Sequence, residues 1–237
     1  MRVLLAALVV SFVGGVALAG PSGVVRDEEL RTTFEERYGA WREWMAKYGY
    51  SSNSTKFFEC DEFRNIVNMG LPVLPLIVEK IGGEEQGARW LGEAVRRITK
   101  VKFRAERRED GRGYVFEEFP GLKPGENVWL RWWKEGRRRT PQRFEKLCKE
   151  WKELRAQGKE EEAWEKYQRI RDLGIVALPC IMEKVEADEG WLIPALSYLT
   201  DNAVKPYAGP DECAAWWKQN RGNWTIPEEV TPEPERK

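Results

Sequence analysis

The sequence predicts a mostly α-helical protein, in which helical hairpins stack into an α-solenoid of two duplicated modules, with a β-hairpin inserted in the first. Residues 69–81 and 173–185 are near copies, with Gly70 and Gly174 standing 104 positions apart. Apolar residues recur at three- and four-residue intervals along most of the chain, as in amphipathic helices. Each copy is followed by a predicted helix with an alanine on its apolar face, and farther on by a Trp-Trp pair. The duplicated unit therefore spans several helices.

Composition and charge exclude several classes of function. The 237 residues are 42% hydrophobic and 33% charged, and Lys plus Arg equals Asp plus Glu at 39 each. This balance provides no field that would attract a polyanion, so we expect no nucleic-acid partner. The chain contains no His, the commonest general base and metal ligand. No motif for a cofactor or a metal is present, so we expect neither.

The first residues have the features of a signal peptide. A positive start at Arg2, an apolar run over 3–13 and the small residues Ala17 and Ala19 suit a cleavage site after residue 19. We expect residues 1–19 to be removed and the mature chain to be extracytoplasmic, either periplasmic or secreted, without an integral membrane anchor. Retention of this segment as an anchor is the alternative.

Export would permit disulfide bonds among the four cysteines. They are widely spaced, and four cysteines allow three full pairings. Cys148 lies on an apolar helical stripe and Cys180 lies within the second copy of the echoed helix. These positions favour buried free thiols, with at least one disulfide as the alternative. The four residues are Cys60, Cys148, Cys180 and Cys213.

The first module is expected over residues 27–136. Residues 20–26 are predicted to be flexible, Asp27 is a candidate cap for the first helix, and Gly39 is a point where that helix would bend or split. Gly70 ends a helix in the manner of a C-cap glycine, and Pro72 begins the next. The helices of this module are expected over 27–48, 55–69, 72–81, 86–100 and 126–135.

A β-hairpin is predicted over 101–119, within the first module. Asp110 and Gly111 suit its turn, and Tyr114, Phe116 and Phe119 supply residues that favour strands. The Trp-Trp pairs of the two modules are 84 positions apart, whereas the preceding helices are 101 apart, so the first copy has extra residues here. A disordered charged loop is the alternative.

The second module is expected over residues 140–224. Arg137–Arg139 would separate it from the first as a solvated linker, with a phosphate site as the alternative. Thr140 followed by Pro141 is a strong helix start, an N-cap before a first-turn proline. The segment 225–237 is rich in Pro and Glu and is predicted to be a disordered tail. The helices of this module are expected over 140–156, 160–173, 174–186, 189–200 and from about 210.

The duplicated unit resembles a HEAT repeat, in which a helical hairpin opens near a proline and its second helix carries an Ala-x-x-x-Leu stripe. The matching positions are Leu74, Pro75, Ile77, Leu91, Ala94 and Ile98 in the first copy, and Leu178, Pro179, Ile181, Leu192, Ala195 and Leu199 in the second. The ending, with Leu199, Thr200 and the Trp216-Trp217 pair, is similar to bacterial extracytoplasmic proteins of this type. The resemblance implies an armadillo-like helical scaffold for protein binding. Its motifs specify a solenoid and hardly specify a ligand.

Three functions are weighed from these observations. The first is an exported, non-enzymatic scaffold that binds a protein partner. The second is a module that binds glycans or the cell wall through exposed Trp, although helical spacing of the Trp residues favours core packing. The third, an enzyme, lacks a nucleophile elbow or a plausible carboxylate pair. The candidate interaction surface is Arg89, Arg96, Arg97, Lys100, Tyr114, Phe116, Arg137, Arg138 and Arg139.

Overall fold

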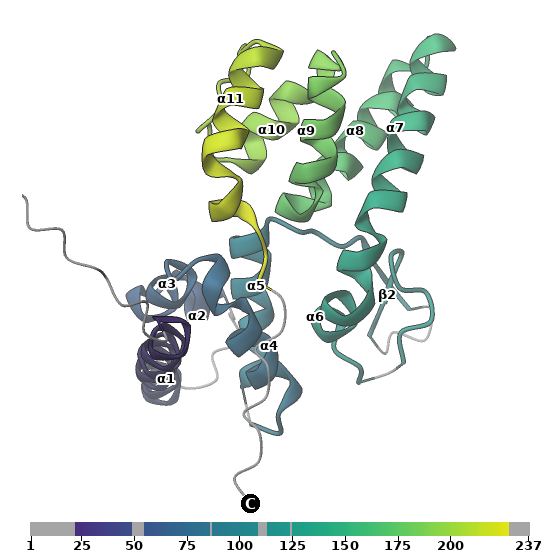
Figure 1. The fold of residues 1–237 in the computed structure, drawn as a ribbon. Coiled ribbons are helices and arrows are strands. Elements are labelled where there is room, and N and C mark those ends of the chain that lie inside the picture. Colours follow the sequence, from purple (N-terminus) through teal and green to yellow (C-terminus); the bar gives the residue numbers. More distant parts are fainter. Residues whose placement is uncertain (1–21, 49–54, 86, 109–112, 124, 228–237) are drawn as a thin grey trace, which may run out of the picture.

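The computed structural model describes residues 22–48, 55–85, 87–108, 113–123 and 125–227. Over these ranges the protein is mostly helical, with a short two-stranded antiparallel hairpin (Figure 1). The prediction of a mostly α protein is therefore confirmed. The expected signal peptide, residues 1–19, lies outside the described residues, as does all of the expected tail beyond residue 227.

The N-terminal half forms the lower part of the molecule in Figure 1. In it, α1 packs against α3, and α4 packs against α5. Short 3₁₀ turns, Leu71–Val73 and Ala88–Leu91, lead into α4 and α5. The helices of this half are α1 (Ser22–Tyr48), α2 (Thr55–Glu59), α3 (Asp61–Val67), α4 (Leu74–Gly82) and α5 (Gly92–Thr99).

The C-terminal half lies above it, with its helices in sequence order across the molecule (Figure 1). Helices α7 and α8 form an antiparallel pair, α10 packs on both α8 and α9, and α11 covers α9. Turns of 3₁₀ helix, Gly174–Ala177 and Gly190–Leu192, lead into α9 and α10. The helices are α7 (Thr140–Ala156), α8 (Glu160–Asp172), α9 (Leu178–Glu186), α10 (Ile193–Leu199) and α11 (Pro210–Asn220), followed by a 3₁₀ turn, Arg221–Trp224.

The predicted hairpin joins the halves. Strands β1 (Ala105–Arg107) and β2 (Tyr114–Phe116) pair antiparallel, with Ala105 opposite Phe116. The turn residues Asp110 and Gly111 lie outside the described residues. After the hairpin comes α6 (Val128–Arg131), which lies with it beneath the start of α7 (Figure 1).

The two echoed segments fold alike. Each consists of a 3₁₀ turn followed by a helix of nine residues, α4 or α9. The glycines before them have nearly the same backbone angle, with φ of 70° at Gly70 and 71° at Gly174. Positive φ favours glycine, which explains why both copies keep it. The equivalent leucines, Leu74 and Leu178, are both completely buried.

The first helix differs from its prediction in length and shape. It begins at Ser22 instead of Asp27, so Asp27 is not its cap and residues 22–26 are helical. It also runs through Gly39 without a break. Burial of Phe34, Tyr38 and Trp41 along one face holds this helix against its neighbours, and such packing outweighs the modest helix cost of one glycine.

The helix expected over 55–69 is divided at Cys60. The backbone of Cys60 is extended, with φ of −76° and ψ of 160°. The break leaves the Phe57 carbonyl oxygen without a helical partner, and the Trp41 indole Nε1 donates to it at 2.9 Å. Because Phe63 of α3 packs against the same Trp41 ring, the break lets both short helices face α1.

Arg137–Arg139 do not form a linker. They make a 3₁₀ turn inside a helical run that continues from α6 through a π turn, Trp132–Gly136, into α7. Thr140 is consequently buried rather than capping, and its hydroxyl donates to the Gly136 carbonyl oxygen at 3.4 Å. Pro141, which lacks an N–H and crowds the preceding turn, explains why the hydrogen-bond pattern changes here without ending the run.

Most of the tryptophan serves the core, as its spacing predicted. Both rings of the Trp132-Trp133 pair are buried. Of the twelve Trp side chains, only Trp164 is exposed, at 58%.

All four cysteines are free, and burial raises the pKa of Cys148 to about 12. Among the described residues, no helix is both long and apolar enough to cross a membrane.

Candidate functional site

The two halves meet at two residues that occupy corresponding places in the two similar stretches of sequence. Lys100 and Asp201, which are 101 positions apart, both follow a buried threonine and both have positive φ, of 58° and 53°. Their side chains form an ion pair with each other, and Lys100 Nζ also donates to the Tyr198 carbonyl oxygen at 3.1 Å. The ends of α5 and α10 are therefore joined, and Lys100 is part of the joint rather than of a free surface.

The second echoed glycine sits inside this joint. A Cβ at Gly174 would lie 2.3 Å from the Thr99 carbonyl oxygen, whereas a Cβ at Gly70 would have only Pro72 Cδ within reach, at 3.9 Å. Beside it, the Lys102 amide donates to the Asp172 carbonyl oxygen at 2.9 Å. Segment 99–104 thus lies directly against the start of the second copy.

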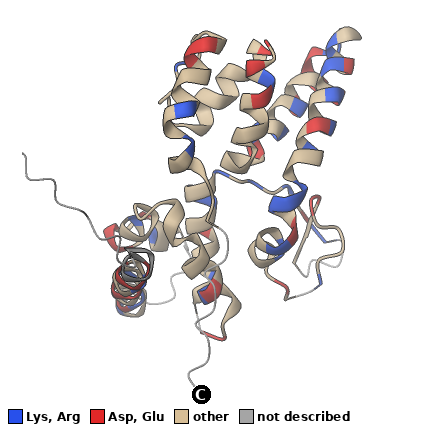
Figure 2. Cartoon of the chain, viewed as in Figure 1, with Lys and Arg blue, Asp and Glu red and all other residues tan. Residues whose placement is uncertain are grey.

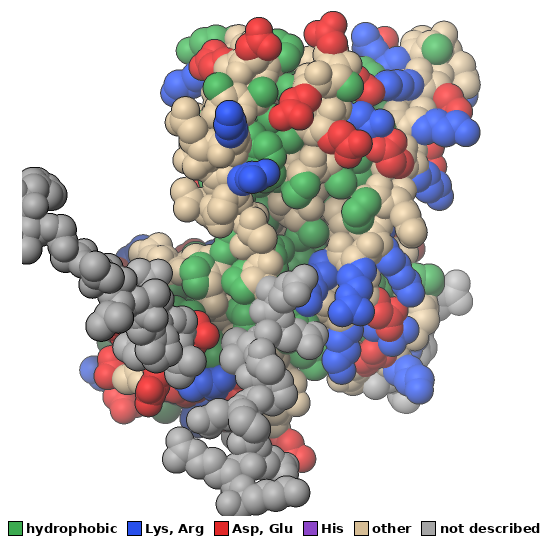
Figure 3. Space-filling model, viewed as in Figure 1, with side chains coloured by type: hydrophobic (Ala, Val, Ile, Leu, Met, Phe, Trp, Pro, Cys, Tyr) green, Lys and Arg blue, Asp and Glu red, His purple; other side chains and the backbone are tan. Residues whose placement is uncertain are grey.

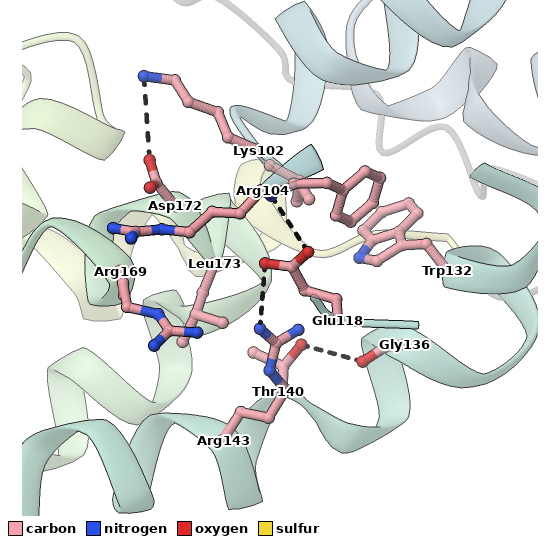
Figure 4. Close-up of a pocket in the computed structure, with 12 residues that line it drawn as sticks. Lys102, Arg104, Glu118, Trp132, Gly136, Thr140, Arg143, Arg169, Asp172 and Leu173 are labelled. Atoms are coloured by element: carbon pink, nitrogen blue, oxygen red, sulfur yellow. Dashed lines mark hydrogen bonds and ion pairs between the residues drawn. The ribbon is translucent and has the colours of Figure 1, made fainter. Parts of the chain in front are cut away.

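The hairpin insertion is clamped to α7 and α8 by charge. Glu118, with 6% of its side chain exposed, accepts from the Arg104 amide at 3.2 Å and pairs with Arg143 Nη2 at 3.5 Å. Figure 4 shows Glu118 between these two residues, with Asp172 facing Lys102. Burial raises the pKa of Asp172 above its ordinary value, although Lys102 opposes the shift.

The cavity enclosed by this charged joint is too small for a ligand. Its volume is about 10 Å³, which is no more than a single water occupies. The insertion therefore fastens the halves together. Tyr114 remains 62% exposed at the far end of the hairpin, whereas Phe116 packs edge-on against Phe103, with ring centroids 6.1 Å apart.

A larger, open groove lies between the start of α7 and α11. Its volume is about 710 Å³. Apolar and aromatic side chains supply much of its lining, and guanidinium groups supply the charge. Within the described part of the chain, ten residues line the groove and none of them is acidic. They are Arg137, Arg138, Ile175, Val176, Pro179, Trp217, Arg221, Trp224, Thr225 and Ile226. We call this site the α7–α11 groove.

Figure 3 shows the surroundings of the groove. Hydrophobic side chains are visible on the surface between α9 and α11, and Lys and Arg side chains gather where α7 begins. Figure 2 places this basic cluster on the helical turns around the start of α7, whereas farther along α7 both signs of charge alternate. The groove therefore combines an apolar strip with a basic flank.

Arg137 is held in place on this flank. Its guanidinium carbon lies 4.1 Å from the centroid of the Trp133 ring, and its Nε donates to the Trp133 carbonyl oxygen at 2.8 Å. Its Nη1 donates to the Pro227 carbonyl oxygen at 3.5 Å. A guanidinium stacked on a buried ring loses little freedom on binding a ligand, so this group is partly preorganised.

The aromatic wall comes from α11 and the turn after it. Trp216 contacts both Trp217 and Trp224, with ring centroids 6.2 Å and 6.1 Å apart. All three rings are half-buried. Trp217 and Trp224 therefore each pack one part of the ring inward and present another part to the groove.

Of the predicted surface residues, the stripe on α5 is engaged internally. Arg96 and Arg97 both bind the Glu93 carboxylate, and Arg97 also donates to the Phe58 carbonyl oxygen at 2.9 Å. Although burial disfavours its charge, these hydrogen bonds hold the pKa of Glu93 below its ordinary value. Arg89 is exposed beside a separate hollow of about 330 Å³, where it lies over the Trp90 ring.

The structure divides the remaining predicted residues. Arg137 and Arg138 line the groove, whereas Arg139 points to Glu135, with which it pairs at 3.0 Å. Sequence reasoning missed Arg221 and Val176 as lining residues. Arg221 belongs to no motif, and Val176 stands where the first copy has Pro72, which marks no surface.

Comparisons with protein-family models, with curated proteins and with solved structures give no match. In the part of the chain that the structure describes, no group of three or more Cys, Asp or Glu residues is placed to hold a metal ion.

Proposed function

We propose that this protein is an exported, non-enzymatic scaffold of the HEAT-like solenoid type, which binds a protein partner in the α7–α11 groove. The observation that carries the proposal is the groove itself, which has an apolar strip, two half-buried Trp rings and an open side. Binding sites in proteins are usually concave and largely apolar, with a few polar groups for orientation.

The packing of the helices supports a scaffold. Helices that follow one another in sequence are packed together in α7 and α8, in α9 and α10, and in α4 and α5. Stacked hairpins of this kind present extended surfaces between neighbouring units, which repeat proteins use to bind other chains. The apolar start of the chain supports export, since it has the features of a signal peptide.

Site-specific photocrosslinking in cells tests the proposal. Val176 is half-buried in the groove and is replaced by p-benzoylphenylalanine, which forms covalent adducts only with molecules in direct contact. Irradiation is expected to yield discrete protein adducts of higher mass. The same replacement at Lys149, 78% exposed on α7 and outside the groove lining, serves as the control and is expected to yield none. Adducts at Lys149 without adducts at Val176 would contradict a partner in the groove.

Glycan binding is the second candidate function, and the observation that favours it is Trp164. This ring is 58% exposed and is stacked on Tyr167, with the ring planes 18° apart. A flat, rigid aromatic face of this kind suits a sugar ring. Titration with cell-wall oligosaccharides should then quench Trp fluorescence in the wild type and less so in Trp164→Ala. A flat titration across such a panel would remove this candidate.

A further inference from the structure

We infer that the partner enters the α7–α11 groove as an acidic linear peptide, with carboxylates that meet Arg138 and Arg221. This inference rests on the proposed function and names the chemistry of the partner. Its basis is charge complementarity. The ten described residues of the lining include Arg137, Arg138 and Arg221, and none of these ten carries a carboxylate. A groove lined by one sign of charge raises the local concentration of ligands of the opposite sign.

Two arginines of the groove lack the carboxylate partner that most other described arginines have. Within the described residues, neither Arg138 nor Arg221 has a carboxylate partner, and both are exposed. Their neighbour Arg139, by contrast, pairs with Glu135. Since Lys and Arg equal Asp and Glu in number across the chain, two unpaired guanidinium groups at one groove are a local excess of positive charge. Arginine is suited to this role because its planar fork binds carboxylates through two parallel hydrogen bonds.

The apolar strip indicates a peptide instead of a highly charged polyanion. Val176 is half-buried and Pro179 is exposed, and both lie in the same lining as Trp217. Apolar side chains of a peptide would be removed from water here, which provides affinity that a sugar–phosphate backbone would not gain. Alternating acidic and apolar side chains therefore fit the groove best.

The protein's own chain shows that extended backbone is accommodated at this edge. Thr225 has an extended conformation, with φ of −85° and ψ of 123°, and Ile226 is partly buried against the core. The next carbonyl, that of Pro227, accepts from Arg137 Nη1. Extended backbone at Thr225 thus lies along one side of the groove, and the carbonyl two residues later is bound by an arginine. A linear partner would lie beside it.

Fluorescence anisotropy on the full mature chain tests the inference. The probe is a short fluorescein-labelled peptide in which pairs of glutamate alternate with single leucines, and two matched peptides carry glutamine or lysine in place of glutamate. We expect the glutamate peptide to bind at least about tenfold more tightly than the glutamine peptide, and the lysine peptide not to bind. The double variant Arg138→Gln, Arg221→Gln should weaken the glutamate peptide about tenfold and leave the glutamine peptide unchanged.

Two controls separate the groove from general charge. Lys149→Gln removes an exposed cation outside the lining, and it should leave the affinity within about twofold. A chain that ends at Pro227 removes the acidic segment 228–237, and it should also bind within about twofold. Because Arg138 and Arg221 are exposed, we expect the double variant to keep its melting temperature, which circular dichroism checks.

Each outcome decides one point. Equal binding of the glutamate and glutamine peptides, lost on Val176→Arg, would overturn an acidic partner but leave a peptide-binding groove. Equal weakening by Lys149→Gln would mean non-specific charge and would also overturn the inference. A gain of tenfold or more on removing 228–237 would assign the groove to the chain's own tail. If no peptide binds and the Val176 photocrosslinker gives no adduct, the proposed function fails as well.

Discussion

Replacement of the second echoed glycine tests how the two halves are joined. Gly70 and Gly174 occupy equivalent places with nearly identical φ, of 70° and 71°. An alanine at either position is strained by the positive φ, at a cost of about 1–3 kcal/mol. At Gly174 the added Cβ also lies 2.3 Å from the Thr99 carbonyl oxygen and 2.7 Å from the Val101 amide nitrogen. Such overpacking costs about 1–3 kcal/mol more.

The two variants therefore form a matched pair. We expect Gly174→Ala to lower the free energy of unfolding by about 2 kcal/mol more than Gly70→Ala, measured by urea denaturation. For a chain of this size, that difference corresponds to roughly 4–8 °C in melting temperature. Val101→Ala should not rescue Gly174→Ala, because the shortest contact is to a backbone oxygen of Thr99. Equal destabilisation by both glycine substitutions would refute the close approach of the halves at this point.

Three further outcomes follow from the described geometry and the N-terminal sequence. Because burial raises the folded-state pKa of Asp172, its contribution to stability is present at low pH and is lost as pH rises through that pKa. The free energy of unfolding of Asp172→Asn, measured in urea at each pH, should therefore rise relative to that of the wild type between about pH 4 and pH 7. A difference between the two proteins that stays constant with pH would contradict this. With its pKa raised to about 12 by burial, Cys148 should react with iodoacetamide at pH 8 roughly a thousandfold more slowly in the folded protein than in urea, as followed by peptide mass spectrometry. Equal rates would show that the thiol is accessible. Finally, the intact mass of the protein recovered from the extracytoplasmic fraction is expected to correspond to a chain that begins at Gly20, and a full-length mass would favour a retained anchor.

Local sequence signals predicted the helices and the hairpin well. Glycine with positive φ, proline in the first turn and apolar residues at helical spacing act over a few residues, so Gly70 and Leu74 identified the end of one helix and the face of the next. The strand residues Tyr114 and Phe116 likewise identified the second arm of the hairpin. These features depend on neighbours along the chain, which a sequence contains in full.

Predictions that depended on distant contacts were less accurate. Gly39 was expected to interrupt a helix, and Arg137–Arg139 were expected to be a linker. In each case packing with residues far along the chain decided the outcome, through the burial of Tyr38 and Trp41 in one case and of Trp133 in the other. The free energy gained by burying these aromatic side chains exceeds the local tendency of a glycine or a run of charges to interrupt a helix.

In the candidate site, too, local sequence features were predictable and contacts between distant segments were not. Arg137 and Arg138 form a basic run in the sequence, but their neighbours in the groove come from the 3₁₀ turn before α9, from α9, from α11 and from the turn after α11. No spacing in the sequence connects these segments. Arg96 and Arg97 form a second basic run in the sequence, yet the Glu93 carboxylate pairs with both. From the sequence alone one can predict a mostly helical protein with two similar segments and a short hairpin between them. Which arginines are paired and which face an open groove depends on the fold, because an ion pair forms only between side chains that the tertiary structure brings within a few ångströms.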